Sequence, residues 1–259
     1  MVDYYQRLYS SSNSCVPFAD MSSIIPSLVT ESDNGYLTTI PIDEEIKNCV
    51  FSMDPGSAPG LDGFSGAFYQ NCWNIVGSDV CRGVRQFFQC SWLYPNMNSN
   101  FIVFIPKSPD ANEITKFRPI ALANFFFKII PKILADRLAS VASRIVSPHQ
   151  HAFIKGRKIT DCIALVSEGI HFIDKKAHGG NVGFKLDVTK AFHTMDWEFI
   201  LSALRHFGFC ESLICWVKTI LESAKLSVLI NRSPYGFFGC SRGVRQGDPL
   251  SRILFFLPS

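Results

Sequence analysis

The 259-residue sequence lacks several features that would place a protein in a class at once. Its nine cysteines form no Cys-x-x-Cys pair, and their odd number and irregular spacing argue for reduced intracellular thiols. The N-terminus lacks the basic-then-apolar layout of a secretory signal. The most apolar stretch, residues 120–134, is interrupted by Lys128, Pro131 and Lys132, which excludes a bilayer span. We therefore expect an intracellular protein, in the nucleus or cytoplasm, that is neither secreted nor embedded in a membrane.

The sequence also has little excess charge, but this charge is unevenly distributed. A net charge of +3 is too small to indicate nucleic-acid binding by itself. Residues 1–100 carry 4 basic and 10 acidic side chains, whereas residues 101–160 carry 10 basic and 3 acidic ones, a net charge of +7. Residues 161–259 carry 11 basic and 9 acidic side chains. The middle third is therefore the expected phosphate-facing surface, although a solvated basic face agrees with the counts nearly as well.

Hydrophobic residues make up 47% of the chain and charged residues only 18%, which argues against disorder. A chain of this length can bury the core of one large domain or of two subdomains. Residues 1–38 are polar and weakly periodic, and we expect a linker there or the tail of a missing upstream domain. Periodicity and residue type predict the regular elements. Helices are expected over 42–53, 66–73, 78–90, 124–146, 160–176, 197–207, 211–222 and from Pro249 onward, and strands over 101–105, 117–122, 182–187, 225–230 and 236–240.

The first candidate site lies at the end of the strand expected over 182–187. The sequence Phe184-Lys-Leu-Asp-Val-Thr-Lys-Ala-Phe192 places the carboxylate of Asp187 directly after an apolar run. Such a position suits a metal ion that must meet a polyphosphate. A lone aspartate after a strand is more often a turn or cap residue, so the spacing alone favours the structural interpretation.

The second candidate site is the segment Arg242-Gly-Val-Arg-Gln-Gly-Asp-Pro-Leu-Ser251. Gln246 and Gly247 stand at its bend, where glycine allows the backbone to approach a flat substrate closely. Asp248 and Pro249 supply an N-cap and an N1 proline for the helix that follows. Those two residues would also serve an ordinary helix N-terminus with no ligand.

Together, in this order and spacing, the two motifs resemble those of the reverse transcriptases of non-LTR (LINE-type) retrotransposons, especially plant ones. The resemblance covers roughly residues 40–257, and the combination is specific although each motif alone is weak. It implies an α+β fold, namely the fingers and a partial palm of a right-hand polymerase. Residues 1–38 would be a leader, residues 39–180 a fingers-like region and residues 181–259 a truncated partial palm.

The resemblance also implies an activity and its cofactor. The family's RNA-directed DNA polymerases extend a DNA primer on an RNA template with dNTPs and two Mg²⁺ ions. Asp187 would be the catalytic carboxylate and metal ligand, and Phe192 the steric gate that excludes a 2′-hydroxyl. The positions that would contact the nucleotide are Lys107, Arg118, Phe192, Gln246 and Gly247.

Template contacts are implied in the segment Gln150-His-Ala-Phe-Ile-Lys-Gly-Arg157, through Lys155, Arg157 and Lys158. An exposed basic loop explains the same residues about equally well. Lys107 and Arg118 have a similar alternative, because a solvated hairpin would carry the same charges. These roles therefore depend mainly on the resemblance.

The sequence departs from the family at several positions. His193 stands where the family usually has aspartate, and a bulkier, partly cationic ring there could shift Phe192. Pro131 interrupts an expected helix, Arg252 replaces a frequent proline, and Asn231-Arg232 replaces the Asn-Gly of a tight hairpin turn. Such changes suit a decaying copy of an element.

The 259 residues contain no Asp-Asp pair, whereas the family takes further metal ligands from an Ala-Asp-Asp hairpin. That hairpin, the thumb and an upstream endonuclease would belong to missing segments of a parent polyprotein. We therefore expect this chain to be inactive by itself. Two alternatives stay open, a non-catalytic nucleic-acid-binding module and a retroelement relic without function. RNA binding would separate the first from the second.

Overall fold

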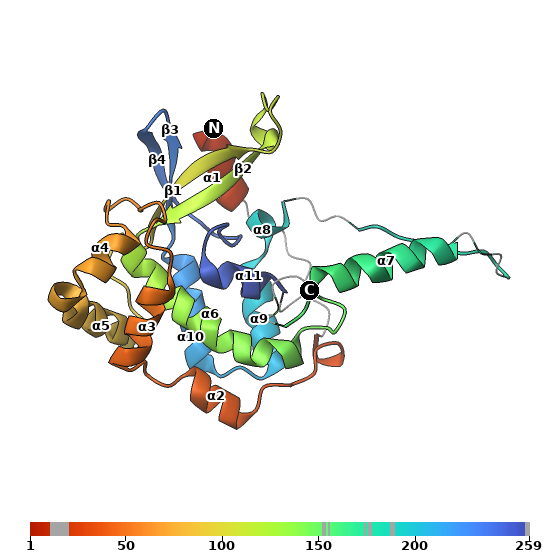
Figure 1. Ribbon diagram of the computed structural model, residues 1–259, viewed down its shortest axis with the longest axis horizontal. Coiled ribbons are helices and arrows are strands. Elements are labelled where there is room, and N and C mark those ends of the chain that lie inside the picture. Colours follow the sequence, from red (N-terminus) through yellow and green to blue (C-terminus); the bar gives the residue numbers. More distant parts are fainter. Residues whose placement is uncertain are drawn as a thin grey trace.

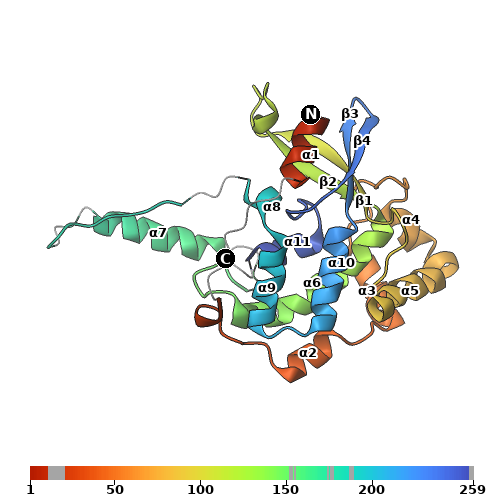
Figure 2. The same ribbon diagram turned by 180° about the vertical axis from the view of Figure 1, so that it is seen from behind.

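The structure is a computed structural model that describes residues 1–10, 21–151, 154, 156–173, 175, 178–186 and 190–256. A four-stranded sheet lies at one end of a body of helices, and one helix projects from that body (Figures 1 and 2). Among the described helices, none is both long and apolar enough to cross a membrane. The elements are α1 (Val2–Ser10), η1 (Met21–Ser23), α2 (Glu31–Leu37), α3 (Asp43–Ser52), α4 (Gly66–Asn71), α5 (Trp73–Cys90), β1 (Ser99–Pro106), η2 (Ile114–Lys116), β2 (Phe117–Ala123), α6 (Phe125–Ile145), α7 (Ile159–Ile173), α8 (Ala191–Thr194), α9 (Trp197–Phe207), α10 (Glu211–Glu222), β3 (Lys225–Ile230), β4 (Ser233–Gly239) and α11 (Pro249–Phe256).

The sheet has the strand order β2-β1-β3-β4 and consists of two hairpins. Antiparallel pairing runs from Asn100 opposite Ala123 to Pro106 opposite Phe117 in the first hairpin, and β3 pairs with β4 in the second. The hairpins join through parallel pairing of β1 with β3. Both expected hairpins are confirmed, and so is the α+β class. Parallel neighbours need a long crossover, which is supplied by the helices between β2 and β3.

Helix α6 runs through the centre of the helical body, and 13 of its 21 residues are buried. Its apolar residues recur around the helix because it is covered by α2, α3, α5 and α11. Pro131 lies inside α6 and is itself buried. It removes the hydrogen bond to the carbonyl of Phe127, a cost that the surrounding burial offsets. The helix expected over 124–146 is thus confirmed despite its proline.

The N-terminal segment differs from the linker expected over residues 1–38. Residues 2–10 form α1, whose Tyr5 and Tyr9 are 1% and 4% exposed. They pack with Ile102 of β1 and with Leu226 and Val228 of β3, so α1 covers one face of the sheet. The sequence did not predict the burial of these tyrosines, because the helix is short and otherwise polar. The boundaries proposed at residues 38 and 180 stay predictions.

The strand expected over 182–187 is not formed in its described part. Residues 181–186 have no regular structure, and Phe184 and Leu186 are 86% and 89% exposed. A strand needs a neighbour to satisfy its backbone groups, and within the described residues the sheet takes its four strands from elsewhere. The preceding helix, α7, has no buried residue and projects from the body (Figure 1). Asp187 lies outside the described residues.

Replacing Arg232 by glycine is expected to raise the free energy of unfolding by about 0.5–1 kcal/mol. Asn231 and Arg232, in the β3–β4 turn, have φ values of 49° and 67°. A side chain in this left-handed region costs roughly 1–2 kcal/mol, and the extra flexibility of glycine in the unfolded chain offsets part of the gain. Urea unfolding measures the difference. Arg232→Ala is the matched control and should give no comparable gain, because alanine meets the same strain; equal gains would contradict the argument.

Candidate nucleotide-facing site

The two sequence motifs dock directly onto each other. The backbone N–H of Val244 donates to the carbonyl of Phe192 at 2.6 Å, and that of Gly243 donates to the carbonyl of Met195 at 2.7 Å. Gly243 has a φ of 80°, and a Cβ there would lie 2.5 Å from the carbonyl oxygen of His193. Only glycine permits this approach. The loop that begins the second motif is therefore fitted to the residues that end the first.

Phe192, the predicted steric gate, is half-buried and stacked. Its ring lies 4.3 Å from that of Phe255 in α11, with an interplanar angle of 9°. The chain enters α8 through Lys190, which adopts a φ of 55°. Stacking and the contact with the second motif fix the position of the ring, which a gate requires. The role of Phe192 as a gate stays a prediction.

The bend at Gln246 and Gly247 packs against strand β2. The N–H of Ala121 donates to the carbonyl of Gln246 at 2.8 Å. Gly247 has a φ of 112°, and a Cβ there would lie 2.7 Å from the carbonyl oxygen of Ala121. This glycine therefore allows a close approach to the protein's own strand, and its predicted approach to a nucleotide stays a prediction. Within the described residues, the side-chain oxygen Oε1 of Gln246 is buried and has no hydrogen-bond partner.

A buried polar cluster lies beneath this bend, and sequence reasoning missed it. Arg245 is 5% exposed and donates from Nη2 to Asp248 at 2.7 Å and from Nη1 to the side-chain oxygen of Asn98. Its guanidinium lies over the ring of Phe127, 5.3 Å from the centroid. Asn98 in turn donates to the carbonyl of Ile220 at 2.8 Å. The cluster ties the second motif to α6, to α10 and to the residue before β1.

Asp248 has a second role in the same loop. Its other carboxylate oxygen accepts the N–H of Leu250 at 2.9 Å, and Pro249 is the first residue of α11. The predicted N-cap and N1 proline are thus confirmed. The signal for the buried pair was the i, i+3 spacing of Arg245 and Asp248, which by itself also fits an exposed pair.

Two cations, Lys107 and Lys190, lie near the docked motifs, whereas Arg118 is placed only on the β1–β2 hairpin. Lys107 is exposed and donates to the carbonyl of Thr115 at 2.9 Å, and Arg118 is exposed on β2. Lys190 was not singled out from the sequence, although it belongs to the first motif. Its Nζ donates to the hydroxyl of Tyr4 in α1 at 2.6 Å and lies over that ring.

His193 lies among these cations, but it is not one of them. Burial, the largest cause, and the charges of Lys190 and Lys107 together lower its pKa to about 4, so both ammonium groups are near the ring. The ring is 5% exposed and packs edge-on against Tyr9, 5.5 Å between centroids. At neutral pH it is uncharged. The expectation of a partly cationic ring is therefore wrong, whereas the expected shift of Phe192 stays a prediction.

The predicted template-binding residues are only partly described, because Lys155 lies outside the described residues. Arg157 caps the C-terminal end of α6, with Nη1 donating to the carbonyl of Gln150 at 2.7 Å and Nη2 to that of Ser143 at 3.0 Å. These bonds give Arg157 a structural role that the sequence interpretation did not include. Lys158 is exposed at the start of α7. The structure does not bring Arg157 and Lys158 to the docked motifs through any described contact.

The charge of +7 in residues 101–160 is partly neutralised in the fold. Arg137 is buried and forms a two-bond pair with Glu45, both bonds at 2.7 Å. Arg144 pairs with Asp33 at 2.6 Å, and Lys132 pairs with a carboxylate of its own helix. The acidic first third of the chain supplies two of these three partners. Charge counted along the sequence therefore overstates the charge available to phosphate.

No group of three or more His, Cys, Asp or Glu side chains that could hold a metal ion occurs in the part of the chain that the structure describes. The described residues by themselves do not fit a two-metal centre. Asp187 is the candidate ligand and lies outside them.

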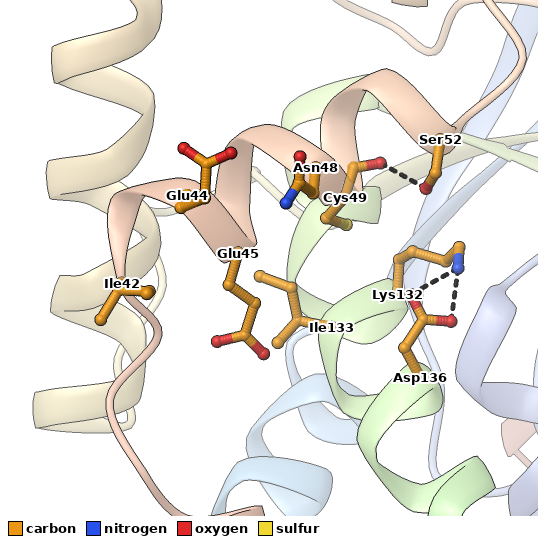
Figure 3. Close-up of a pocket in the computed structure, with 9 residues that line it drawn as sticks. All are labelled: Ile42, Glu44, Glu45, Asn48, Cys49, Ser52, Lys132, Ile133 and Asp136. Atoms are coloured by element: carbon orange, nitrogen blue, oxygen red, sulfur yellow. Dashed lines mark hydrogen bonds and ion pairs between the residues drawn. The ribbon is translucent and has the colours of Figure 1, made fainter.

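A pocket of about 520 Å³ lies between α3 and α6, away from the docked motifs (Figure 3). The side chains that point toward it include Glu45, Lys132 and Asp136. Glu45 is bound to Arg137, and Lys132 to Asp136 at 2.5 Å. Cys49 lies in the same wall, and burial raises its pKa to about 12. Because Glu45 serves the contact between α3 and α6, and Lys132 and Asp136 pair with each other within α6, we assign the pocket no ligand.

Comparison with known proteins agrees with this geometry. Residues 105–257 match the family of reverse transcriptases, RNA-dependent DNA polymerases. The chain is 30% identical over 259 residues, 98% of its length, to an uncharacterized 149 kDa protein of transposon TX1 from Xenopus laevis. It is 28% identical to the Pol polyproteins of the R2 elements of Nasonia vitripennis and Drosophila melanogaster, over 77% and 78% of its length.

The chain spans about a fifth of the length of these relatives, 19%, 19% and 18% respectively. The family match covers more than half of the chain and includes both docked motifs. The chain therefore belongs to the reverse transcriptase family, as a domain of the kind found in the polyproteins of non-LTR retrotransposons.

Proposed function

We propose that this domain holds a template RNA, a DNA primer and an incoming dNTP for RNA-directed DNA synthesis. The observation that carries the proposal is the direct docking of the two motifs, in which Val244 binds the carbonyl of Phe192. This contact supports the proposal that the predicted gate and the Gln246–Gly247 bend belong to one site. Further segments of a parent polyprotein, including an endonuclease, belong to the same proposal, as does a location in the nucleus or cytoplasm.

The exposed cations suit the triphosphate of the nucleotide. Arg118 can grip two phosphate oxygens at once, and Lys107 acts as a point charge. Lys190, held by Tyr4, adds a third charge close to Phe192. Gln246, half-buried at the bend, brings a polar amide but no charge to a base or sugar. Together these groups provide binding and orientation.

The family uses divalent metal ions, and we propose Mg²⁺ with Asp187 as the ligand from this chain. When bound, two such ions would activate the attacking 3′-oxygen and stabilise the leaving phosphates. Mg²⁺ is usually held by more than one carboxylate together with phosphate. Because Asp187 has no Asp-Asp partner within the 259 residues, we propose that this chain binds nucleic acid without synthesising DNA by itself.

Binding of single-stranded RNA tests the proposal. The chain is expected to bind unrelated RNAs alike, with log K falling linearly with log salt at a slope of roughly −1.5 to −3, about −0.7 per phosphate neutralised. Replacing Lys107 and Arg118 by glutamine should flatten the slope by about 1.4. Fluorescence anisotropy across a KCl series measures it. Lys218→Gln, an exposed lysine on α10, is the control and should change nothing.

A primer-extension assay on the same protein tests the proposal that this chain does not synthesise DNA by itself. Primer extension on an RNA template is expected to show no incorporation of dNTPs. Template-dependent incorporation that Asp187→Ala abolishes would contradict the proposed inactivity and would show that one carboxylate suffices. Folded protein that binds no RNA at low salt would contradict the binding role and leave a relic without function.

A further inference from the structure

Helix α1 contacts both β4 and α8, so the N-terminal segment of the chain reaches the docked motifs (Figure 2). Its buried Tyr5 packs against Phe104 of β1, with 5.3 Å between the ring centroids. The start of the helix approaches β4 closely, because a Cβ on Gly236 would lie 2.6 Å from the Cγ1 of Val2. The helix is therefore fitted to the face of the sheet that it covers.

The C-terminal end of α1 is bonded to the start of the second motif. The carbonyl of Tyr9 accepts the N–H of Ser241 at 2.9 Å and that of Arg242 at 3.2 Å. The Nε of Arg242 donates to the carbonyl of Leu8 at 2.8 Å. A helix leaves its last carbonyls without partners of its own, and a cation is favoured at this end. The second motif therefore supplies the donors and the charge that the end of α1 needs.

Tyr4 connects α1 to the first motif. Lys190 donates from Nζ to the hydroxyl of Tyr4 at 2.6 Å, and this Nζ lies 4.9 Å from the centroid of the Tyr4 ring. The ring of Tyr4 in turn packs edge-on against that of Tyr5, 5.1 Å between centroids. Because Tyr5 is buried on the sheet, these contacts tie the ammonium group of Lys190 to the core beneath α1.

The backbone of Lys190 also has a special conformation. Its φ of 55° and ψ of 31° lie in the left-handed region, which a side chain disfavours. Its carbonyl accepts the N–H of His193 at 2.8 Å. The side chain is exposed, and a lysine ammonium carries three donors on a flexible stem. The bond to Tyr4 uses one of them. An ammonium that is already held in place can bind a ligand without the cost of being ordered first.

We infer that Tyr4 is a positioning residue of the nucleotide-facing site, which holds the ammonium of Lys190 where it meets the triphosphate of an incoming nucleotide. The inference rests on the proposed function, which supplies the ligand. Lys107 is a second cation beside the same His193 ring, and two cations suit a ligand with several phosphates. Tyr4 acts through Lys190 and not by touching the nucleotide. The segment expected to be a leader is then part of the site.

A double-mutant cycle tests whether Tyr4 acts through Lys190. Equilibrium dialysis measures the binding of labelled dGTP to the full chain, with Mg²⁺ and an RNA template whose next base is cytosine and whose DNA primer ends in a dideoxynucleotide. Lys190→Met is expected to weaken dGTP binding about fivefold and Tyr4→Phe about threefold. In the Lys190→Met background, Tyr4→Phe should change nothing, because the hydroxyl then has no ammonium to hold.

Tyr5→Phe is the matched control. It removes a hydroxyl from the neighbouring tyrosine of the same helix and keeps the ring, so dGTP binding should stay unchanged. Thermal unfolding checks that each variant is folded. Fluorescence anisotropy of the primed template should give the same affinity for Tyr4→Phe as for the unchanged chain. Weaker template binding would place Lys190 on a backbone phosphate and would overturn the choice of the triphosphate.

Acetylation of lysines, read by peptide mass spectrometry, tests the contact without a nucleotide. The rate at Lys190 is compared with that at Lys218, an exposed lysine of α10, in the same molecule. Tyr4→Phe should raise this ratio about threefold, because the charged form of Lys190 loses a hydrogen bond that stabilises it. Tyr5→Phe should leave the ratio unchanged. An equal ratio in Tyr4→Phe and in the unchanged chain would overturn the contact.

The outcomes separate this inference from the proposed function. If dGTP binds but Tyr4→Phe has no effect, or has the same effect in both backgrounds, Tyr4 is not a positioning residue and the proposed function stands. The same holds if Lys190→Met leaves dGTP binding unchanged. If the folded chain binds neither the primed template nor dGTP, the proposed function fails and the inference is overturned with it.

Discussion

Replacing Asp248 by alanine is expected to lower the free energy of unfolding by about 3–5 kcal/mol, the usual cost of leaving one member of a buried ion pair alone. Arg245 and Asp248 are each about 5% exposed at their side chains, and their N–O distance is 2.7 Å. Without the carboxylate, the partners left to the guanidinium among the described residues would be Asn98, the carbonyl of Ile220 and the ring of Phe127. The N-cap bond to Leu250 would be lost as well.

Urea unfolding of the purified chain measures this loss. The control is Asp79→Ala, which removes a carboxylate from an exposed pair with Arg82, 75% exposed on both sides, and should cause no measurable change. Replacing both members of the buried pair, Arg245→Met with Asp248→Leu, should recover much of the stability because no charge is left unpaired. A small loss in Asp248→Ala, within the error of the control, would mean that water reaches Arg245 and that the cluster is not buried in solution.

The parts of the fold that sequence reasoning predicted are those in which local pattern and tertiary packing agree. The β1–β2 hairpin, α9 and α10 each have strong periodicity and a face that the protein buries, and α6 has a long apolar pattern that the protein buries on several sides. In α9, Asp196 accepts the N–H of Phe199 at 3.0 Å and Gly208 ends the helix with a φ of 94°, as the sequence predicted. Caps and turns carry their own chemistry, so they can be recognised without the rest of the molecule.

The predictions that failed depend on a distant partner. Residues 182–186 have the composition of a strand, but no described segment pairs with them. Tyr5 and Tyr9 lie in a segment that the sequence predicts to be polar and exposed, and they are buried because α1 packs on the sheet. At the site, the docking of Val244 on Phe192 and the burial of Arg245 come from contacts across fifty or more residues, which one sequence does not reveal. The predicted roles of Lys107, Arg118 and Gln246 remain predictions, although the fold places Lys107 near the docked motifs.

His193 should make the stability of this protein fall steeply as the pH is lowered from about 6.5 toward 4. Its pKa is near 6.5 in the unfolded chain and about 4 in the fold, because burial disfavours the charged ring. Above pH 6.5 the ring of His193 is neutral in both the folded and the unfolded chain, so it adds no pH dependence to the free energy of unfolding. Below it, the unfolded chain takes up a proton that the folded state refuses. At pH 4.5 this uptake should cost about 2.5 kcal/mol of the free energy of unfolding.

The variant His193→Phe isolates this effect. Phenylalanine keeps a ring beside Tyr9, and it removes two buried ring nitrogens whose polar contacts among the described residues are limited to the backbone of Lys190. It should therefore not destabilise the fold at pH 7.5, and the unchanged chain should lose about 2.5 kcal/mol more than the variant between pH 7.5 and pH 4.5. Urea unfolding at the two pH values gives the comparison, because carboxylates that titrate in both proteins cancel. His178→Phe, at an exposed position, should behave as the unchanged chain does. If the free energy of unfolding falls equally with pH in the unchanged chain and in His193→Phe, the prediction is wrong. The ring of His193 would then be solvated in the folded protein and not buried beneath the second motif.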